Sequence, residues 1–197
     1  MTRLLLLAAL ILHAAPVLAQ SRVDAALGIG YARTLDDEGS IGSGVSLAGD
    51  LSVRVTPRIG LGVRVDRIHN VRDAAGGALV IDGDSTIVGA EARFHVGGGA
   101  VQPILHAGYG ILSYSGTTTL GAPQTASLFD PSRSPITVTT STKSGSAGVV
   151  SAGADLDVFV SPRISIRPGI MVNMTQGAGE SLPWMLWRAG VGVGIHW

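Results

Sequence analysis

The chain has 197 residues, a formal net charge of zero, no cysteine, 28 glycines and only 14% charged residues. This length suits one domain, the missing cysteines exclude disulfide bonds and thiolate metal sites or nucleophiles, and the neutral charge gives no basic field for nucleic acid. Beyond the N-terminal segment, no apolar stretch is long enough for a membrane-spanning helix, and the glycine content disfavours helices in general.

The N-terminal segment predicts a secretory signal peptide. Its first three residues include a positive charge at Arg3, the stretch LLLLAALILHAAPVLA supplies an apolar core, and Val17-Leu18-Ala19 forms a small-x-small cleavage site. We therefore expect a signal peptide over residues 1–19 and one exported domain over residues 20–197. Because no cysteine lies near the predicted cut, a lipid-anchored lipoprotein is excluded.

Stretches that alternate between apolar residues and small or polar residues recur along the chain. This period of two is that of a β-strand with two different faces. In chain order, strands are expected at 22–32, 44–55, 59–68, 86–96, 101–114, 148–160 and 164–172, and then at the C-terminal stretch RAGVGVGIHW, 188–197. In that last stretch one row is wholly apolar and the other holds glycine, Arg188 and His196.

The connections between these strands alternate in length. Tight turns are centred on Pro57, Gly98 and Pro162, whereas the connections at 34–43, 70–85, 115–146 and 175–183 are longer. An even number of strands with short turns at one end and long loops at the other is typical of outer-membrane barrels. Strands of about ten residues also suit the span of a bilayer, and only a closed sheet pairs every backbone group there. The prediction is an all-β, eight-stranded antiparallel up-and-down transmembrane barrel with short periplasmic turns and long outer loops.

The two faces of each strand are expected to meet different surroundings. The apolar row would face lipid, and the row of glycines and charges would fill an interior that is just wide enough for side chains. Because an unpaired buried charge is costly, we expect these charges to form a luminal salt-bridge network. Its predicted members are Asp24, Asp50, Arg54, Arg64, Asp66, Glu91, Arg93, Asp155, Asp157, Arg167 and Arg188.

Aromatic residues gather near the predicted strand ends, as interfacial girdles do. Tyr31, Tyr114, Trp184 and Trp187 fall near the long loops, and Phe94, Phe159 and Trp197 fall near the short turns. Pro103 and Pro168 fit less well, because proline has no N–H for the ladder, and we expect each at a strand end or bulge.

Three stretches carry a resemblance to a known family. They are QPILHAGYGI, the hairpin AGADLDVFVSPRISIRPGI and the terminal VGVGIHW. With them the whole mature chain resembles the small eight-stranded outer-membrane β-barrel superfamily of the OmpX and OmpA transmembrane-domain type. The resemblance implies residence in the outer membrane of a Gram-negative-type bacterium, with outer-membrane lipid and the barrel assembly machinery as partners. It also implies that Trp197, where phenylalanine is more usual, is the aromatic assembly signal.

Few residues suggest a catalytic or metal-binding site. His95, His106 and His196 share the inward row with carboxylates, which could bind a metal or act as general bases. No HxH or HExxH spacing supports that interpretation, so we expect them to be hydrogen-bonded members of a polar core. The sequence also has no His-x-Ser pair like that of the outer-membrane lipid A deacylases, because His95-Val96-Gly97 and His106-Ala107-Gly108 lack the serine. We expect no catalytic, cofactor or metal site.

The favoured function is a structural or adhesive role, with a side-chain-filled lumen and long extracellular loops that interact with other surfaces. The 115–146 loop is either a solvated surface loop or a protruding hairpin whose edge binds a protein or surface ligand. A small pore or transporter for modest apolar solutes is the alternative, since luminal glycines, Ile104 and Leu112 would suit one. A lipid-modifying enzyme and a soluble lipocalin-like barrel with inverted faces are less favoured.

Overall fold

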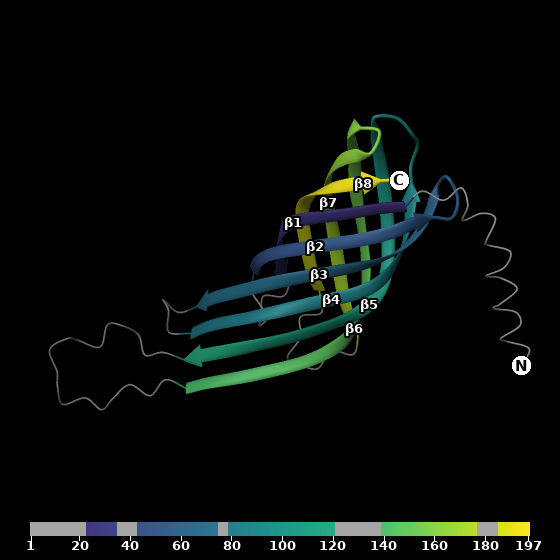
Figure 1. Ribbon diagram of the computed structural model, residues 1–197. Helices are drawn as coiled ribbons and strands as arrows, with labels where there is room; N and C mark the ends of the chain where they lie inside the picture. Colours follow the sequence, from purple (N-terminus) through teal and green to yellow (C-terminus); the bar gives the residue numbers. More distant parts are fainter. Residues whose placement is uncertain (1–22, 35–42, 75–78, 121–138, 177–184) are drawn as a thin grey trace, which may run out of the picture.

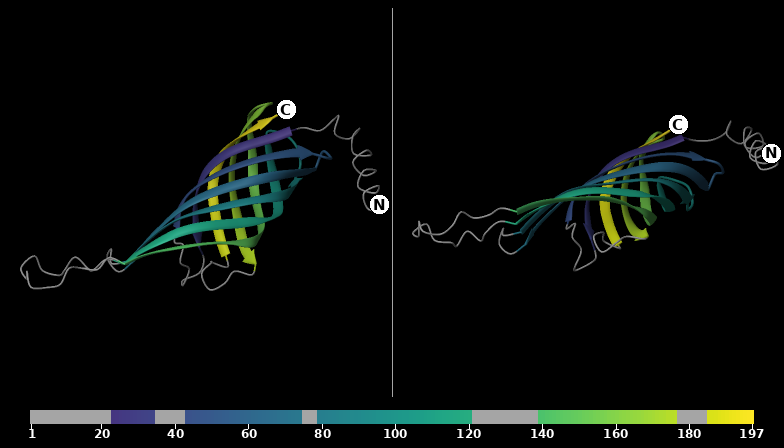
Figure 2. Two further views of the ribbon diagram at one scale, coloured as in Figure 1. Left: turned by 60° about the horizontal axis from the view of Figure 1, so that its bottom comes forward. Right: turned by 90° about the horizontal axis from the view of Figure 1, so that it is seen from below.

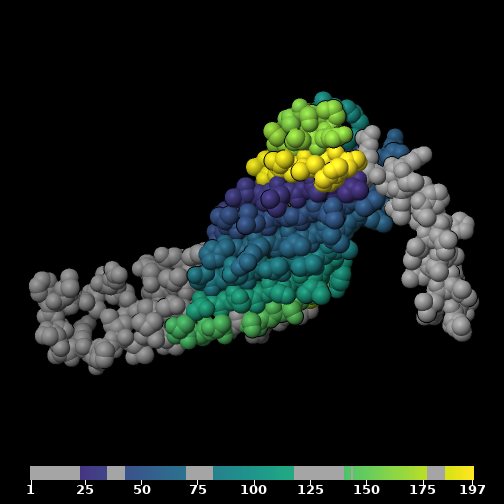
Figure 3. All heavy atoms as spheres, viewed as in Figure 1, coloured from purple at the N-terminus to yellow at the C-terminus, as the bar shows by residue number. Residues whose placement is uncertain are grey.

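The protein is a closed antiparallel barrel. The computed structural model describes residues 23–34, 43–74, 79–120, 139–176 and 185–197. These form β1 (Val23–Thr34), β2 (Ser43–Arg54), β3 (Ile59–Ala74), β4 (Leu79–His95), β5 (Val101–Leu120), β6 (Thr139–Ser161), β7 (Ile164–Gln176) and β8 (Met185–His196). Each strand pairs with the next, and β8 closes the ring against β1, so that yellow lies beside purple in Figure 3. The predicted eight-stranded up-and-down barrel is confirmed.

Exposure alternates along the strands as the sequence predicts. In β1, Leu27 and Ile29 are exposed, while Asp24 and Ala32 are completely buried. The outward rows of the other strands are likewise aliphatic, with Leu47, Leu61 and Ile166 all exposed. Charged residues therefore point inward and large apolar ones outward, the reverse of a soluble barrel. No helix among the described residues has the length and hydropathy to cross a membrane.

Glycines let neighbouring backbones approach closely at two seams on opposite sides of the ring. At the β1–β8 seam Gly30 pairs with Gly190, and a Cβ on Gly30 would lie 2.5 Å from the carbonyl oxygen of Ala189. At the β4–β5 seam Gly89 pairs with Gly110, and a Cβ on Gly110 would collide with the carbonyl oxygen of Val88. Only glycine permits this approach between neighbouring backbones.

The barrel wall is much taller on one side. The strands β3 to β6 have 16, 17, 20 and 23 residues, whereas β1, β2 and β8 have 12 and β7 has 13. Figures 1 and 2 show the far ends of β5 and β6 projecting to one side, past the shorter strands. Much of the predicted loops 70–85 and 115–146 is therefore strand. The hydropathy pattern does not predict this extension, because hydroxyl-rich stretches such as 115–120 have no apolar face.

The prolines and aromatic residues only partly follow the expected pattern. Pro168 lies on β7 in the interval between the Asp155–Gly169 and Val158–Ile166 pairs, where its missing N–H interrupts the ladder. Tyr31 and Phe94 face outward, and Tyr31 meets Trp187 edge-on at 6.1 Å between ring centroids. Tyr114 and Phe159, however, occupy inward rows, so they are not part of outer girdles. Trp184 and the predicted signal peptide, 1–19, lie outside the described residues.

Candidate functional site

The turn-end half of the lumen is built around two buried aspartates. Asp24 of β1 accepts from Arg54 Nε at 2.8 Å and contacts His196 Nδ1 at 2.5 Å. Asp157 of β6 accepts from Arg167 Nε at 2.7 Å and Nη2 at 3.1 Å, which is a bidentate contact. Both aspartates have no exposed surface, so each carboxylate depends on partners within the protein.

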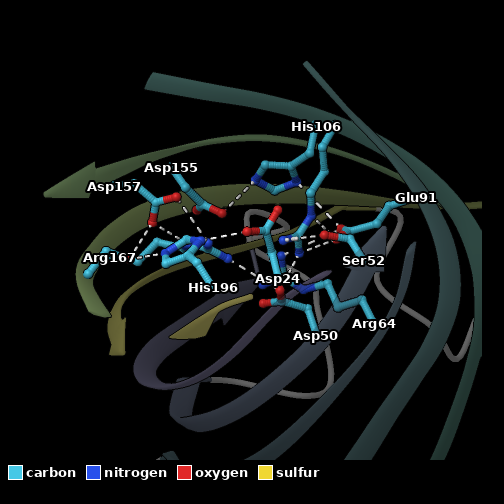
Figure 4. Close-up of polar contacts among 12 residues, drawn as sticks. Asp24, Asp50, Ser52, Arg64, Glu91, His106, Asp155, Asp157, Arg167 and His196 are labelled. Carbon is cyan, nitrogen blue, oxygen red and sulfur yellow. Dashed lines mark hydrogen bonds and ion pairs between the residues drawn. The ribbon is translucent and has the colours of Figure 1, made fainter. Parts of the chain in front are cut away.

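Further along the lumen, arginines bridge strands from opposite walls. Arg167 Nη1 lies 3.3 Å from Asp50 Oδ1, and Arg93 Nη2 lies 2.5 Å from the same oxygen. Arg93 also binds Glu91 of its own strand, whose second oxygen lies 3.9 Å from Arg64 Nη1. The chain of contacts thus crosses from β7 through β2 to β3 and β4 (Figure 4).

The network continues to the loop-side half of the lumen through Asp66. Its two oxygens accept from Arg64 Nε at 2.8 Å and Arg188 Nη1 at 3.0 Å. His106 lies between Glu91, 3.8 Å away, and Asp155, 3.4 Å away. The structure therefore brings all eleven residues of the predicted network into the lumen and joins them, with His106, His196 and Ser165, into one connected set.

Ser165, His196 and Asp24 are arranged like a catalytic triad, which the sequence did not reveal. His196 Nε2 lies 3.0 Å from Ser165 Oγ, and Nδ1 faces Asp24. Ser165 Oγ also lies 2.8 Å from Asp157 Oδ1, which can only accept, so the hydroxyl hydrogen goes to Asp157 and Nε2 donates to Ser165. Because this hydrogen is directed to Asp157 and Ser165 has no exposed surface, the hydroxyl is not placed to act as a nucleophile, and the arrangement stabilises the core.

The arginines and carboxylates of the lumen nearly balance. The five arginines, Arg54, Arg64, Arg93, Arg167 and Arg188, face six carboxylates. Near neutrality is what a low-dielectric interior requires. The described residues include no group of three or more histidines, cysteines or carboxylates placed to hold a metal ion.

An apolar layer lies in the lumen between this network and the long-loop end. It consists of one inward residue from each of six strands: Ala32, Ile68, Ile87, Leu112, Val149 and Leu186. Leu112, which the sequence suggested as part of an apolar passage, belongs to this layer, whereas Ile104, although buried, lies outside it. Two cavities beside the charged residues have volumes of only 30 and 20 Å³. Each has room for about one water molecule.

A second candidate site is the outer half of β6. Along one edge, β6 pairs with β5 over this whole outer half, from Thr139–Leu120 inward. Among the described residues, β6 pairs with β7 only from Gly148 onward. The backbone from Thr139 to Ala147 therefore has no strand partner on its β7 side within the described part of the chain. We call this segment the free edge.

The outward face near this protruding sheet carries a small charged cluster. His69 of β3 lies with Nδ1 3.1 Å from Asp84 and Nε2 3.8 Å from Asp82, and Arg67 reaches Asp84 at 3.5 Å. His69 is exposed. Its partners could not be found from spacing, because the β3–β4 register brings them together.

Comparisons with known proteins agree with this architecture. The chain matches the family described as outer membrane protein beta-barrel domain over residues 3–195. The comparison with curated proteins finds no relative.

Solved structures show the same fold at low sequence identity. Ail, the attachment invasion locus protein of Yersinia pestis, is 10% identical with a TM-score of 0.60, covering 90% of this chain and 99% of its own. A major outer membrane protein from Thermus thermophilus is 15% identical with a TM-score of 0.59, with the same shares covered, 90% and 99%. Neisserial surface protein A is 15% identical with a TM-score of 0.55, covering 89% and 96%. At such identities the likeness concerns the fold.

Proposed function

Because the chain belongs to the outer membrane protein β-barrel family, a family of the bacterial outer membrane, we propose that it is a surface-interaction protein that works through the free edge of β6. An extended peptide from an external protein would add to the sheet as a further strand beside Thr139–Ala147. Main-chain hydrogen bonds would supply most of the affinity, and the side chains on either face would set the preference for a sequence.

The observation that carries this proposal is the length of the free edge. Unpaired sheet edges recruit other strands, and natural proteins usually shorten or cover them. Here β6 continues from Ala147 to Thr139 beside β5, a distance of roughly 30 Å. Its sequence, TTSTKSGSA, has a single charge at Lys143 and small or hydroxyl side chains elsewhere, so a partner strand meets little steric hindrance.

The interior supports a closed barrel. A solute would have to pass both the apolar layer and a network whose neighbouring cavities hold about one water each. We therefore propose a lumen that stabilises the protein and conducts nothing, and we assign it no catalytic function. Trp197 as the signal read by the barrel assembly machinery stays a prediction that accompanies this proposal.

Ail and Neisserial surface protein A are, by their names, an attachment protein and a surface protein. Ail has also been crystallised in complex with the heparin analogue sucrose octasulfate. These barrels make attachment a reasonable class of function for this chain, without naming its partner.

A pair of proline variants tests the proposal. Backbone N–H groups alternate between the two neighbours of a strand, so of Ser141 and Thr142 one donates to β5 and the other to the free edge. Bacteria displaying Ser141→Pro or Thr142→Pro would be compared with wild type for attachment to epithelial monolayers. The variant that removes the free-edge donor should still fold, as shown by a band on an SDS gel that changes its apparent mass on boiling. Bacteria displaying it should attach about tenfold less than wild type, because a lost hydrogen bond weakens strand addition. Attachment equal to wild type in both variants would contradict the proposal.

A further inference from the structure

The turn end of the barrel holds a recess that the proposed function does not use. Its volume is about 800 Å³, within the range of small-molecule sites. It lies where three parts of the chain meet: the β4–β5 turn and the start of β5 with Gln102, the end of β6 with Phe159 and the turn after it with Arg163, and the C-terminal His196 and Trp197.

The walls of this recess combine three chemical features. Phe159 packs against the His196 ring at 4.7 Å between centroids, and Trp197 is 61% exposed, so aromatic surface is available. Gln102 donates from Nε2 to the Gly97 carbonyl at 3.1 Å, while its buried Oε1 has no hydrogen-bond partner in the described part of the chain. Arg163 is exposed and supplies a positive charge.

A ligand that satisfies all three features needs a flat apolar face, a hydrogen-bond donor and a negative charge. A fatty acid offers no donor for Gln102 Oε1, and a simple anion offers no apolar face. A pyranose ring has a C–H face that packs on aromatic rings and hydroxyl groups that donate. A carboxylate on that sugar would accept from the guanidinium of Arg163 in a charge-assisted, bidentate contact.

We propose that this recess binds an acidic sugar. The ring lies against Trp197 and Phe159, the Gln102 side chain turns so that its Oε1 accepts from a hydroxyl, and the carboxylate binds Arg163. In the architecture of this family the short turns face the periplasm, so the sugar would come from that side. The site is separate from the free edge, which lies at the opposite end of β6.

The chain contains a matched control for Arg163. Thr56-Pro57-Arg58 and Ser161-Pro162-Arg163 form equivalent turns, in which a hydroxyl accepts from the N–H of Ile59 at 2.9 Å and of Ile164 at 3.1 Å. Both arginines are exposed, but only Arg163 lines the recess. General attraction of anions to the turn end would depend on both arginines equally.

The test is an NMR titration of the full-length mature barrel in detergent micelles. N-acetylmuramic acid is the probe, and N-acetylglucosamine, which lacks the lactyl carboxylate, is the neutral counterpart. The signals followed are the Trp197 indole N–H and the Gly98 and Gly99 amides. We expect these signals to shift with N-acetylmuramic acid and to need about tenfold more N-acetylglucosamine for the same shift, because the charge-assisted contact is lost.

The variants decide between the explanations. Arg163→Gln should reduce the affinity for N-acetylmuramic acid to that for the neutral sugar, whereas Arg58→Gln should leave it unchanged. No shift with either sugar would overturn the proposal, as would equal weakening by both variants. Lactate alone giving the same shifts at the same concentration would show an anion site without a sugar, and would overturn it too.

Discussion

Strand β6 has an inner segment that is paired on both sides and an outer segment that is paired on one side among the described residues. From Gly148 to Phe159 it has neighbours on both sides, and its inward residues Gly153, Asp155 and Asp157 fit a crowded, charged lumen. From Thr139 to Ala147 it has β5 on one side and no described strand on the other. Inside a bilayer an unpaired backbone group has no water to bond, so both edges must be paired there. Beyond the bilayer this requirement ends, and an edge is available for a partner.

The largest expected difference between the two regions is the loss of stability when a polar side chain is replaced by alanine. Replacing buried Asp157 by alanine leaves the guanidinium of Arg167 without its bidentate partner. We expect a loss of about 3–5 kcal/mol in the free energy of unfolding, measured by urea unfolding in micelles. Ser144→Ala, at an exposed position of the outer half, should change it by less than about 0.5 kcal/mol.

A second variant checks the origin of that loss. If the cost arises from the uncompensated charge, Arg167→Met added to Asp157→Ala should restore part of the stability, because an apolar replacement of a buried pair is often tolerated. A double variant less stable than Asp157→Ala would show that Arg167 contributes mainly through its other contact, with Asp50.

A smaller difference is expected for two glycines of the same strand. A Cβ on Gly153 would lie 2.5 Å from both the backbone oxygen of Ile170 and the His106 ring. A Cβ on Gly145 would lie 2.8 Å from the Tyr114 side chain, which can move. Gly153→Ala should therefore destabilise the barrel by about 1–3 kcal/mol and Gly145→Ala by less, as measured by the temperature at which the compact band on an SDS gel is lost. Equal effects would show that the outer half is as tightly packed as the inner half.

The sequence was informative where one face of a strand is apolar. Alternation assigned Asp24, Arg93 and Arg188 to the inward row, because a slip of one residue would expose a whole charged row to lipid. Alternation could not identify the partners of these residues, because contacts such as that of Arg167 with Asp50 join β7 to β2 across the lumen. The Ser165–His196–Asp24 arrangement was hidden for the same reason, because its members come from three strands.

The extent of the tall wall was the weakest prediction. Residues such as Thr117 and Thr142 pair in the β5–β6 ladder, yet neither stretch alternates in hydropathy, so the sequence left a solvated loop and a protruding hairpin as alternatives there. Tyr114 and Phe159 were misplaced for a related reason. They lie close to the ends of the predicted strands, as girdle residues do, but their positions in the alternation put them on inward rows.

The most direct test of the free edge is amide hydrogen exchange of β6, resolved by residue, in the protein without a partner. Unpaired amides exchange quickly and laddered amides slowly. We expect slow exchange at successive residues from Gly148 to Asp155, and an alternation of slow and fast amides from Thr139 to Ala147, where only every second N–H faces β5. Slow exchange at every residue from Thr139 to Ala147 would mean that this edge is already covered, and would contradict the proposed mode of binding.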